Sequence, residues 1–360
     1  MGDFLTNLPE QVTREIIERV PVNSLIRCKC VRKSWRSLIN EPEFKTSYSP
    51  KPCLAFSYEN KYMVYDDEAR KPLFRFSMNP PRTIFANSVP YSVVIDSTDG
   101  LLLTRGGYTD TLYVCNPLTR EYVELPPLNK NDHNYVFGFG VSKISGQYKV
   151  LCCEVSSESC KCYVYTLGEG GSWRTISAAT PGSPILRCTN ALFCNGNLHW
   201  LASYSDFEGK HLVCCFDLKT ELFTSFFLPP HVGKHGNCQL CILEGRLCLC
   251  VYLDGHRVVI WKMNKYGDGN SWVKEYTLCL PPDTGGLICP LKVLDNGDLL
   301  LALIFGFRLF IYSKNTKDVK THALLHQSGS VEYNIAAYTP SFVSLKAMGI
   351  HNVQSLNLYS

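Results

Sequence analysis

The stretch NGNLHWL at residues 195–201 decides the fold, because it joins a tight turn to an apolar strand and recurs along the chain. Related stretches are DGLLL at 99–103, EGRLCL at 244–249 and NGDLLL at 296–301. Asn-Gly and Asp-Gly adopt the positive φ angles that two-residue hairpin turns require, so each stretch marks a strand reversal. Successive turns are separated by about 50 residues, except for one interval of about twice that length.

A second element accompanies these turns. It consists of an aromatic or aliphatic strand, a polar turn and a return strand that often ends in prolines, as at residues 113–127 and 215–230 and more faintly at 311–320. Longer variants carry GGSW at 170–173 and GNSW at 269–272. Four short strands in a repeat of about 50 residues are typical of a β-propeller blade, and kelch repeats have about this length.

Two further segments complete the repeat. Residues 137–165 contain FGFG and two strand-like runs, and they fill the long interval, while residues 53–76 form an additional hairpin unit. We therefore predict a β-propeller of about six blades, with five to eight open. The kelch signature of adjacent glycines before an aromatic residue does not recur from unit to unit, so the blades are kelch-like only.

Residues 1–46 follow a different period. Apolar residues recur every four positions from Leu8 to Val20, which places them on one face of a helix. Two further short helices are predicted near 24–30 and 31–40. Three short helices rarely form an independent core, so their apolar side chains indicate docking onto a partner. Periodicity alone also allows this unit to pack on the body of its own chain.

The composition is that of a packed protein with little net charge. Of 360 residues, 45% are hydrophobic and 19% charged, and the net charge of +4 gives no reason to expect a nucleic-acid or membrane partner. The basic residues within 27–36 are expected to form a solvated helix face rather than a phosphate site. The longest apolar run, 299–307, is too short to span a bilayer, and residues 1–6 show no signal peptide.

The 18 cysteines are expected to be reduced, core-packed thiols of an intracellular chain. The best metal candidate combines His231, His235, Cys238 and Cys241, whose side chains suit zinc. However, Cys238 and Cys241 lie three apart in a probable strand, which directs them to opposite faces. We therefore favour core packing and predict no metal.

Motifs of catalysis are also missing. The sequence has no phosphate loop, no His-Glu-x-x-His and no Gly-x-Ser-x-Gly, and FGFG at 137–140 lacks the third glycine of a dinucleotide site. His199 is expected to be a packed strand residue rather than a base. We predict no catalytic residue and no cofactor.

Within residues 8–44, the segments LPE (8–10), EII (15–17), RVPV (19–22), SL (24–25), CKCV (28–31) and KSWRSLI (33–39) resemble an F-box of the type abundant in plants. The resemblance implies docking to a Skp-type adaptor and, through it, to a cullin scaffold in an SCF ubiquitin ligase. It assigns adaptor-facing or helix-orienting roles to Leu8, Pro9, Ile17, Val20, Pro21, Leu25, Cys28, Val31, Lys33 and Trp35. Ile17, Val20, Cys28 and Arg32 depart from the commonest residues of the motif, which bears on adaptor affinity.

Residues 50–346 resemble the F-box-associated domain found behind such F-boxes. The resemblance rests on NPLTR (116–120), GFG (138–140), YKV (148–150), GNLHW (196–200), FD (216–217) and YTPSFVSL (338–345). It implies capture of the protein to be ubiquitinated. These are mostly turn and core positions, so they leave the target open. Candidate target-binding loops are residues 129–135, 177–190, 204–211, 231–237 and 283–289.

We therefore predict a small all-α F-box of three helices (1–46), a linker (47–52), a large all-β propeller-like domain (53–346) and a C-terminal tail (347–360). The predicted function is a non-catalytic substrate-recognition subunit of an SCF ligase in the cytoplasm, the nucleus or both. Two alternatives are an adaptor-bound protein that acts outside a ligase, and a carbohydrate- or small-molecule-binding propeller that uses Trp200 and Trp261 for stacking.

Overall fold

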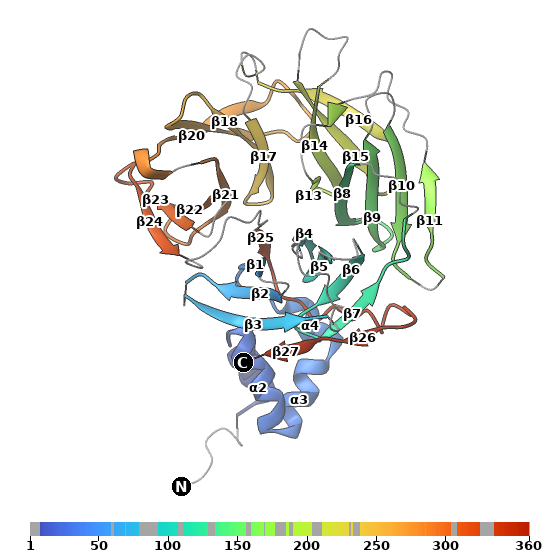
Figure 1. Cartoon of the computed structure of the whole chain (residues 1–360). Coiled ribbons are helices and arrows are strands. Elements are labelled where there is room, and N and C mark those ends of the chain that lie inside the picture. The colour runs from blue at the N-terminus through green and yellow to red at the C-terminus, as the bar shows by residue number, and fades with distance from the viewer. Residues whose placement is uncertain are drawn as a thin grey trace, which may run out of the picture.

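The computed structural model has short N-terminal helices followed by a ring of six β-sheets, which confirms the predicted helical module and six-bladed propeller (Figure 1). The structure describes residues 8–58, 61–68, 70–78, 93–106, 111–128, 134–155, 160–168, 170–176, 185–186, 190–203, 211–229, 232, 238–284, 286–303, 308–324 and 335–359. Within these residues, no helix is long and apolar enough to cross a membrane.

The module has four described helices where the sequence predicted three. They are α1 (Glu10–Glu18), α2 (Val22–Val31), α3 (Lys33–Asn40) and α4 (Pro42–Ser47). Pro9 and Pro21 precede α1 and α2 in extended conformations, and Pro42 lies in the first turn of α4, where its missing N–H costs no helical hydrogen bond. The short α4 is held by Phe44, which is fully buried.

Blades 1 to 3 follow in chain order. Blade 1 contains β1 (Cys53–Tyr58), β2 (Lys61–Asp66) and β3 (Lys71–Ser77), flanked by β25 (Ala336–Tyr338) and β27 (Asn357–Tyr359). Blade 2 contains β4 (Val93–Thr98), β5 (Leu101–Arg105), β6 (Leu112–Asn116) and β7 (Glu121–Glu124), extended by β26 (Gln354–Ser355). Blade 3 contains β8 (Asn134–Val141), β9 (Tyr148–Val155), β10 (Cys160–Thr166) and β11 (Trp173–Ile176).

Blades 4 to 6 complete the ring. Blade 4 contains β12 (Ile185–Leu186), β13 (Leu192–Cys194), β14 (Asn197–Ser203), β15 (His211–Asp217) and β16 (Phe223–Phe227), and both β12 and β13 pair with β14. Blade 5 contains β17 (Cys238–Leu243), β18 (Arg246–Tyr252), β19 (Arg257–Met263) and β20 (Trp272–Cys279). The 3-10 turn η3 (Pro282–Thr284) leads to blade 6, which contains β21 (Ile288–Val293), β22 (Leu299–Leu303), β23 (Arg308–Tyr312) and β24 (Val319–Leu324).

The predicted turn signals form the expected hairpins. Asn195 and Gly196 have φ angles of 54° and 79°, and Asp99-Gly100 and Glu244-Gly245 likewise combine two positive φ values. This is the conformation of a type I′ turn, which matches the twist of the strands that it joins. At residues 296–297 only the glycine has a positive φ angle, so the fourth signal forms a different turn.

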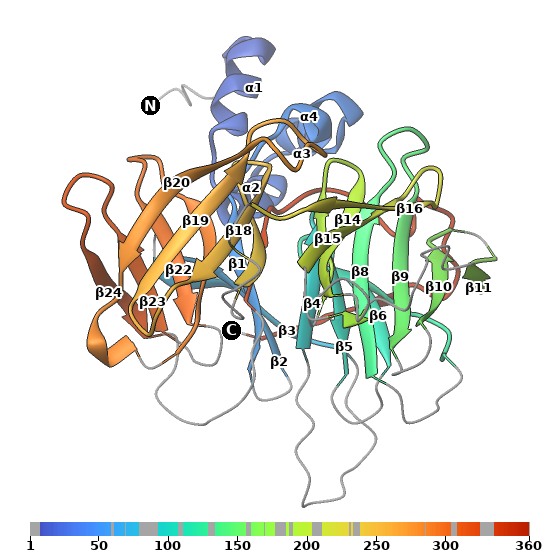
Figure 2. The same cartoon turned by 90° about the horizontal axis from the view of Figure 1, so that it is seen from above.

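The core is divided between neighbouring blades. Separate buried clusters join blades 2 and 3, 3 and 4, 4 and 5, 5 and 6, and 6 and 1. A further cluster joins blades 1 and 2 and continues into the helices. The helices therefore lie at the rim of the ring beside blades 1 and 2, as Figures 1 and 2 show.

The tryptophans of the two Gly-x-Ser-Trp motifs form hydrogen bonds between neighbouring blades. Trp173 in blade 3 donates its indole N–H to the carbonyl of Pro126 after blade 2, at 2.8 Å. Trp272 in blade 5 donates in the same way to Phe227 of blade 4, at 3.1 Å. Both tryptophans thus reach back to the preceding blade, which explains why the motif recurs.

Candidate functional site

The predicted adaptor-binding residues lie on the helices but differ in exposure. Ile17 and Leu25 are 1% and 0% exposed and pack inside the bundle. Pro9, Pro21, Val31 and Lys33 are exposed, and Leu8, Val20, Cys28 and Trp35 are half-buried. In this conformation the exposed and half-buried residues present side-chain surface to a partner, whereas Ile17 and Leu25 do not.

Two exposed apolar residues were missing from the predicted set. Val12 and Ile16 on α1 are 41% and 45% exposed, and Val31 on α2 is 68% exposed. Val12 and Ile16 lie one turn apart on α1, and exposed large apolar side chains that gather in this way indicate a docking surface. The four-residue period from Leu8 to Val20 contained the signal for Val12 and Ile16, although period alone does not tell the inner face of a helix from the outer one.

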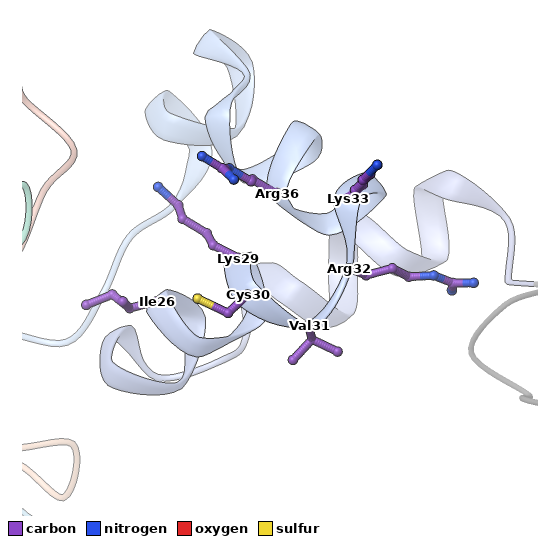
Figure 3. Close-up of a pocket in the computed structure, with 7 residues that line it drawn as sticks. All are labelled: Ile26, Lys29, Cys30, Val31, Arg32, Lys33 and Arg36. Carbon is purple, nitrogen blue, oxygen red and sulfur yellow. The ribbon is translucent and has the colours of Figure 1, made fainter.

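A pocket of about 460 Å³ lies at the α2–α3 corner (Figure 3). It is lined by Ile26, Lys29, Cys30, Val31, Arg32, Lys33 and Arg36. Figure 3 shows the Lys29 and Arg36 side chains extending to the same side. The pocket therefore combines apolar surface with a cluster of positive charge, which suits a partner segment that carries both apolar and acidic side chains.

Lys29 connects this corner to the propeller. Its ammonium group lies 4.7 Å from the centre of the Phe342 ring, a cation–π contact. Burial lowers the pKa of Lys29, and the positive charges of Lys45 and Arg36 lower it further. Lys29 is therefore part of the internal contact between α2 and the C-terminal segment, so the basic cluster is not wholly a solvated face.

Tyr48 is the centre of this junction. Its hydroxyl donates to the carbonyl of Val20 at 2.9 Å, and its ring centre lies 5.7 Å from that of Phe44 and 5.9 Å from that of Phe342. Tyr48 is 8% exposed, and burial, followed by the nearby Cys53, raises its pKa to about 12. Residues 47–52, predicted as a linker, thus begin with the last residue of α4 and a buried tyrosine.

The segment YTPSFVSL at 338–345, which we call the C-terminal clasp, is hydrogen-bonded to blade 2. The fully buried Asn116 donates its amide to the carbonyls of Ser341 and Val343, at 3.0 and 2.7 Å. The carboxylate of Glu121 accepts from the Ser344 hydroxyl at 3.1 Å and from the Leu345 N–H at 2.7 Å. Two segments on which the resemblance rests, 116–120 and 338–345, are therefore hydrogen-bonded to each other.

Gly100 has a steric role in the same clasp. A Cβ atom at this position would overlap the backbone and side chain of Ser341. The Asp99-Gly100 turn, which predicted a strand reversal, thus also leaves space for Ser341 of the C-terminal clasp. Its φ of +78° adds a second reason for glycine here.

The YKV motif of blade 3 contacts two neighbouring blades. Tyr148 donates its hydroxyl to Asp99 of blade 2 at 3.3 Å, whereas the buried Lys149 donates to the Leu218 carbonyl and the Glu221 carboxylate of blade 4, at 2.6 and 2.7 Å. Adjacent residues of a strand point to opposite faces, so one dipeptide serves both interfaces. These contacts assign the motif to the scaffold.

Part of the metal candidate falls outside the described residues. His231 and His235 are not described, and Cys238 and Cys241 lie in β17. Cys241 is buried and lies opposite Cys248 of β18 in the strand register. No cluster of at least three His, Cys, Asp or Glu side chains suited to a metal occurs among the described residues.

His199 is a packed strand residue, as predicted. It is 0% exposed in β14, and its Nε2 lies 2.7 Å from the Tyr266 hydroxyl, while Nδ1 lies 3.2 Å from the Leu192 carbonyl. The carbonyl only accepts, so Nδ1 carries the proton and Nε2 accepts from Tyr266. Burial lowers the pKa of His199 to about 4. The neutral ring thus joins blade 4 to the β19–β20 turn of blade 5.

The proposed aromatic platform does not form a common surface. Trp200 is 2% exposed, packed in the cluster between blades 3 and 4, and its ring meets that of Phe223 edge-on. Trp261 lies in the different cluster between blades 4 and 5 and carries Lys274 over its ring at 5.3 Å. The burial of Trp200 removes the main support for stacking on a sugar.

The candidate target-binding loops fall mainly outside the described residues. This holds for 129–133, 177–184, 187–189, 204–210, 231 and 233–237. Of the segment 283–289, the described part includes Thr284, which is buried and caps η3 by donating to the Pro281 carbonyl. The target surface therefore stays a prediction.

Comparison with known proteins agrees with this architecture. Residues 5–47 match the F-box domain, and residues 53–324 match the F-box associated beta propeller domain. F-box protein At3g07870 of Arabidopsis thaliana is 29% identical, with 84% of each chain covered. F-box protein At5g18160 of the same plant is also 29% identical, with 84% of this chain and 77% of the relative covered. The chain therefore belongs to the family of F-box proteins that carry an F-box-associated β-propeller.

Proposed function

We propose that this protein is the substrate-recognition subunit of an SCF ubiquitin ligase. The helices would bind a Skp-type adaptor, which links them to a cullin, and the propeller would bind a protein target for ubiquitination and degradation. An F-box followed by a propeller fits a substrate-receptor role in general. The complex would act in the cytoplasm, the nucleus or both.

One observation carries this proposal: the helices and the propeller share a single core. Ile17, Leu25 and Phe44 of the helices belong to the same buried cluster as Tyr62 and Leu102 of blades 1 and 2. A partner bound to the helices is therefore held in a defined orientation to a partner bound to the propeller. Such coupling favours a receptor that presents its target to an enzyme bound elsewhere in the complex.

In this role the protein contributes proximity rather than chemistry. Holding a target lysine near a ubiquitin thioester raises their effective concentration, so no side chain of the receptor needs to touch the transferred group. The F-box relatives support the same non-catalytic, adaptor-type role. The cullin and the target are the parts of the proposal that need direct demonstration.

The test is co-purification of the full-length chain with a Skp-type adaptor and a cullin. The variants are Ile16→Asp on α1 and Val31→Asp on α2, which place a charge on exposed apolar positions. The matched control is Leu222→Asp, because Leu222 is 61% exposed in the turn before β16 of blade 4, across the ring from the helices (Figure 1). Unfolding temperature is measured for each variant.

We expect the parent and Leu222→Asp to capture both partners and the two helix variants to capture neither while remaining folded. Capture of the adaptor without a cullin would support a protein that acts outside a ligase and overturn the ligase proposal. Capture of neither partner by the folded parent would overturn both.

A further inference from the structure

Two thiols face each other inside blade 3. Cys153 in β9 and Cys162 in β10 are direct partners in the antiparallel register, and their sulfur atoms are 3.1 Å apart. Each residue is 1% exposed and belongs to the cluster between blades 3 and 4. The sulfurs are thus in contact although the two residues are nine positions apart along the chain.

The backbone geometry permits a bond between them. Direct partners in an antiparallel pair have Cα atoms about 4.5 or 5.5 Å apart, and both values lie within the roughly 4.4–6.8 Å that a disulfide spans. Cys152, by contrast, belongs to the cluster between blades 2 and 3 and packs on the opposite face of the same strand. The adjacent cysteines 152 and 153 therefore do not compete for one partner.

Blade 5 contains the other directly opposed cysteine pair of the described strands. Cys241 and Cys248 are register partners, and both are buried. Cys250 belongs to the same buried cluster, so this group contains three thiols. The blade 3 pair is distinguished by the direct contact of its sulfur atoms, which are 3.1 Å apart.

We propose that Cys153 and Cys162 form a thiol–disulfide site that responds to peroxides. One thiolate attacks a peroxide oxygen and becomes a sulfenic acid, with water as the product when the peroxide is H₂O₂. The second thiol then attacks the sulfenic sulfur, the S–S bond forms, and a second water leaves. Overall, two thiols and one H₂O₂ give one disulfide and two waters, and a dithiol reductant reverses the change.

Access for the oxidant comes from local opening at the hairpin end. Only the pairs Cys160–Val155 and Lys161–Glu154 separate the thiols from the end of the ladder. Strand ends open more often than whole domains unfold, and a peroxide is small. Because the second thiol is already in contact, it captures the sulfenic acid before further oxidation. The closed bond ties β9 to β10 within the blade.

The experiment oxidises the folded full-length chain with H₂O₂, alkylates the remaining thiols under denaturing conditions and maps the digest without reduction. Oxidation continues until the exposed Cys30 and Cys279 are fully modified. We expect a bond between Cys153 and Cys162 that disappears with dithiothreitol. The bond should raise the unfolding temperature by roughly 5 °C, as expected for closing a short loop in a domain of this size.

Variants separate this pair from its neighbours. Cys153→Ser and Cys162→Ser should lose both the linked peptide and the rise in unfolding temperature, whereas the matched control Cys152→Ser should keep both. If Cys30 and Cys279 are fully oxidised and no Cys153–Cys162 bond is found, the proposal is wrong. A disulfide of Cys162 that still forms in Cys153→Ser but is lost in Cys152→Ser would overturn it equally.

Discussion

Removal of the Tyr48 side chain should uncouple the helices from the propeller. Tyr48 is 8% exposed, bonds to the Val20 carbonyl at 2.9 Å and packs between Phe44 and Phe342. The helices provide only a small core of their own, because units of about 40 residues rarely bury enough surface to fold alone. Tyr48→Ala should therefore release the helices while blades distant from the junction stay folded.

The magnitude follows from the contacts. Truncation of a large buried aromatic side chain costs about 3–5 kcal/mol, and the lost hydroxyl contact accounts for about 1 kcal/mol of this. A total of about 4 kcal/mol corresponds to an approximately thousandfold change in an opening equilibrium. Tyr48→Phe keeps the ring and loses only the hydrogen bond, so it should change the equilibrium about fivefold.

Hydrogen exchange of the folded chain, read by mass spectrometry, measures this effect segment by segment. Amides of α1–α4 should exchange up to about a thousandfold faster in Tyr48→Ala, while β17–β20 of blade 5 keep their protection. Tyr312→Ala is the matched control, because Tyr312 is 1% exposed but lies in the cluster between blades 5 and 6. Unchanged protection of the helices in Tyr48→Ala, or equal losses in blade 5, would refute the coupling argument.

Three other predictions concern the propeller. Burial lowers the pKa of His199 from 6.5 to about 4, so the unfolded chain takes up a proton at a higher pH than the folded chain does. The free energy of unfolding should therefore fall by about 3 kcal/mol between pH 6.5 and 4. Urea unfolding of the parent and of His199→Gln checks this, because the variant should lack that part of the decline. Asn116→Ala should cost about 2 kcal/mol, because it leaves the Ser341 and Val343 carbonyls without this donor, and unchanged urea unfolding would contradict the clasp. Deletion of residues 347–360 should uncover the edges of β3 and β7 and increase self-association in light scattering, whereas a monomer of unchanged stability would show that β26 and β27 are dispensable.

The repeated elements of the fold were predictable because their causes are local. Asn195-Gly196 and the related turns carry their backbone requirement within two residues, and the interval of about 50 residues between turns gave the blade length. The helical period of the first residues likewise predicted α1–α3. His199 was correctly assigned to a packed strand from its position inside an apolar run.

The remaining features depend on contacts between distant segments. The sequence gives no local signal that Ser355 pairs with Glu121, or that Phe342 lies against Lys29. The apposition of Cys153 with Cys162 required the register of β9 and β10, which one residue of slippage would destroy. The fourth helix is only six residues long, and it is stabilised by the burial of Phe44 rather than by its own propensity.

The contacts of the family motifs bear on where target specificity resides. Asn116 binds the C-terminal clasp, and Tyr148 and Lys149 bind neighbouring blades. Side chains occupied in this way maintain the ring and are poor candidates for discriminating between targets. If the protein is a receptor, related proteins can share these residues and still bind different targets through surfaces outside the motifs. The shared core at Tyr48 would then hold each of those surfaces in the same orientation to the adaptor.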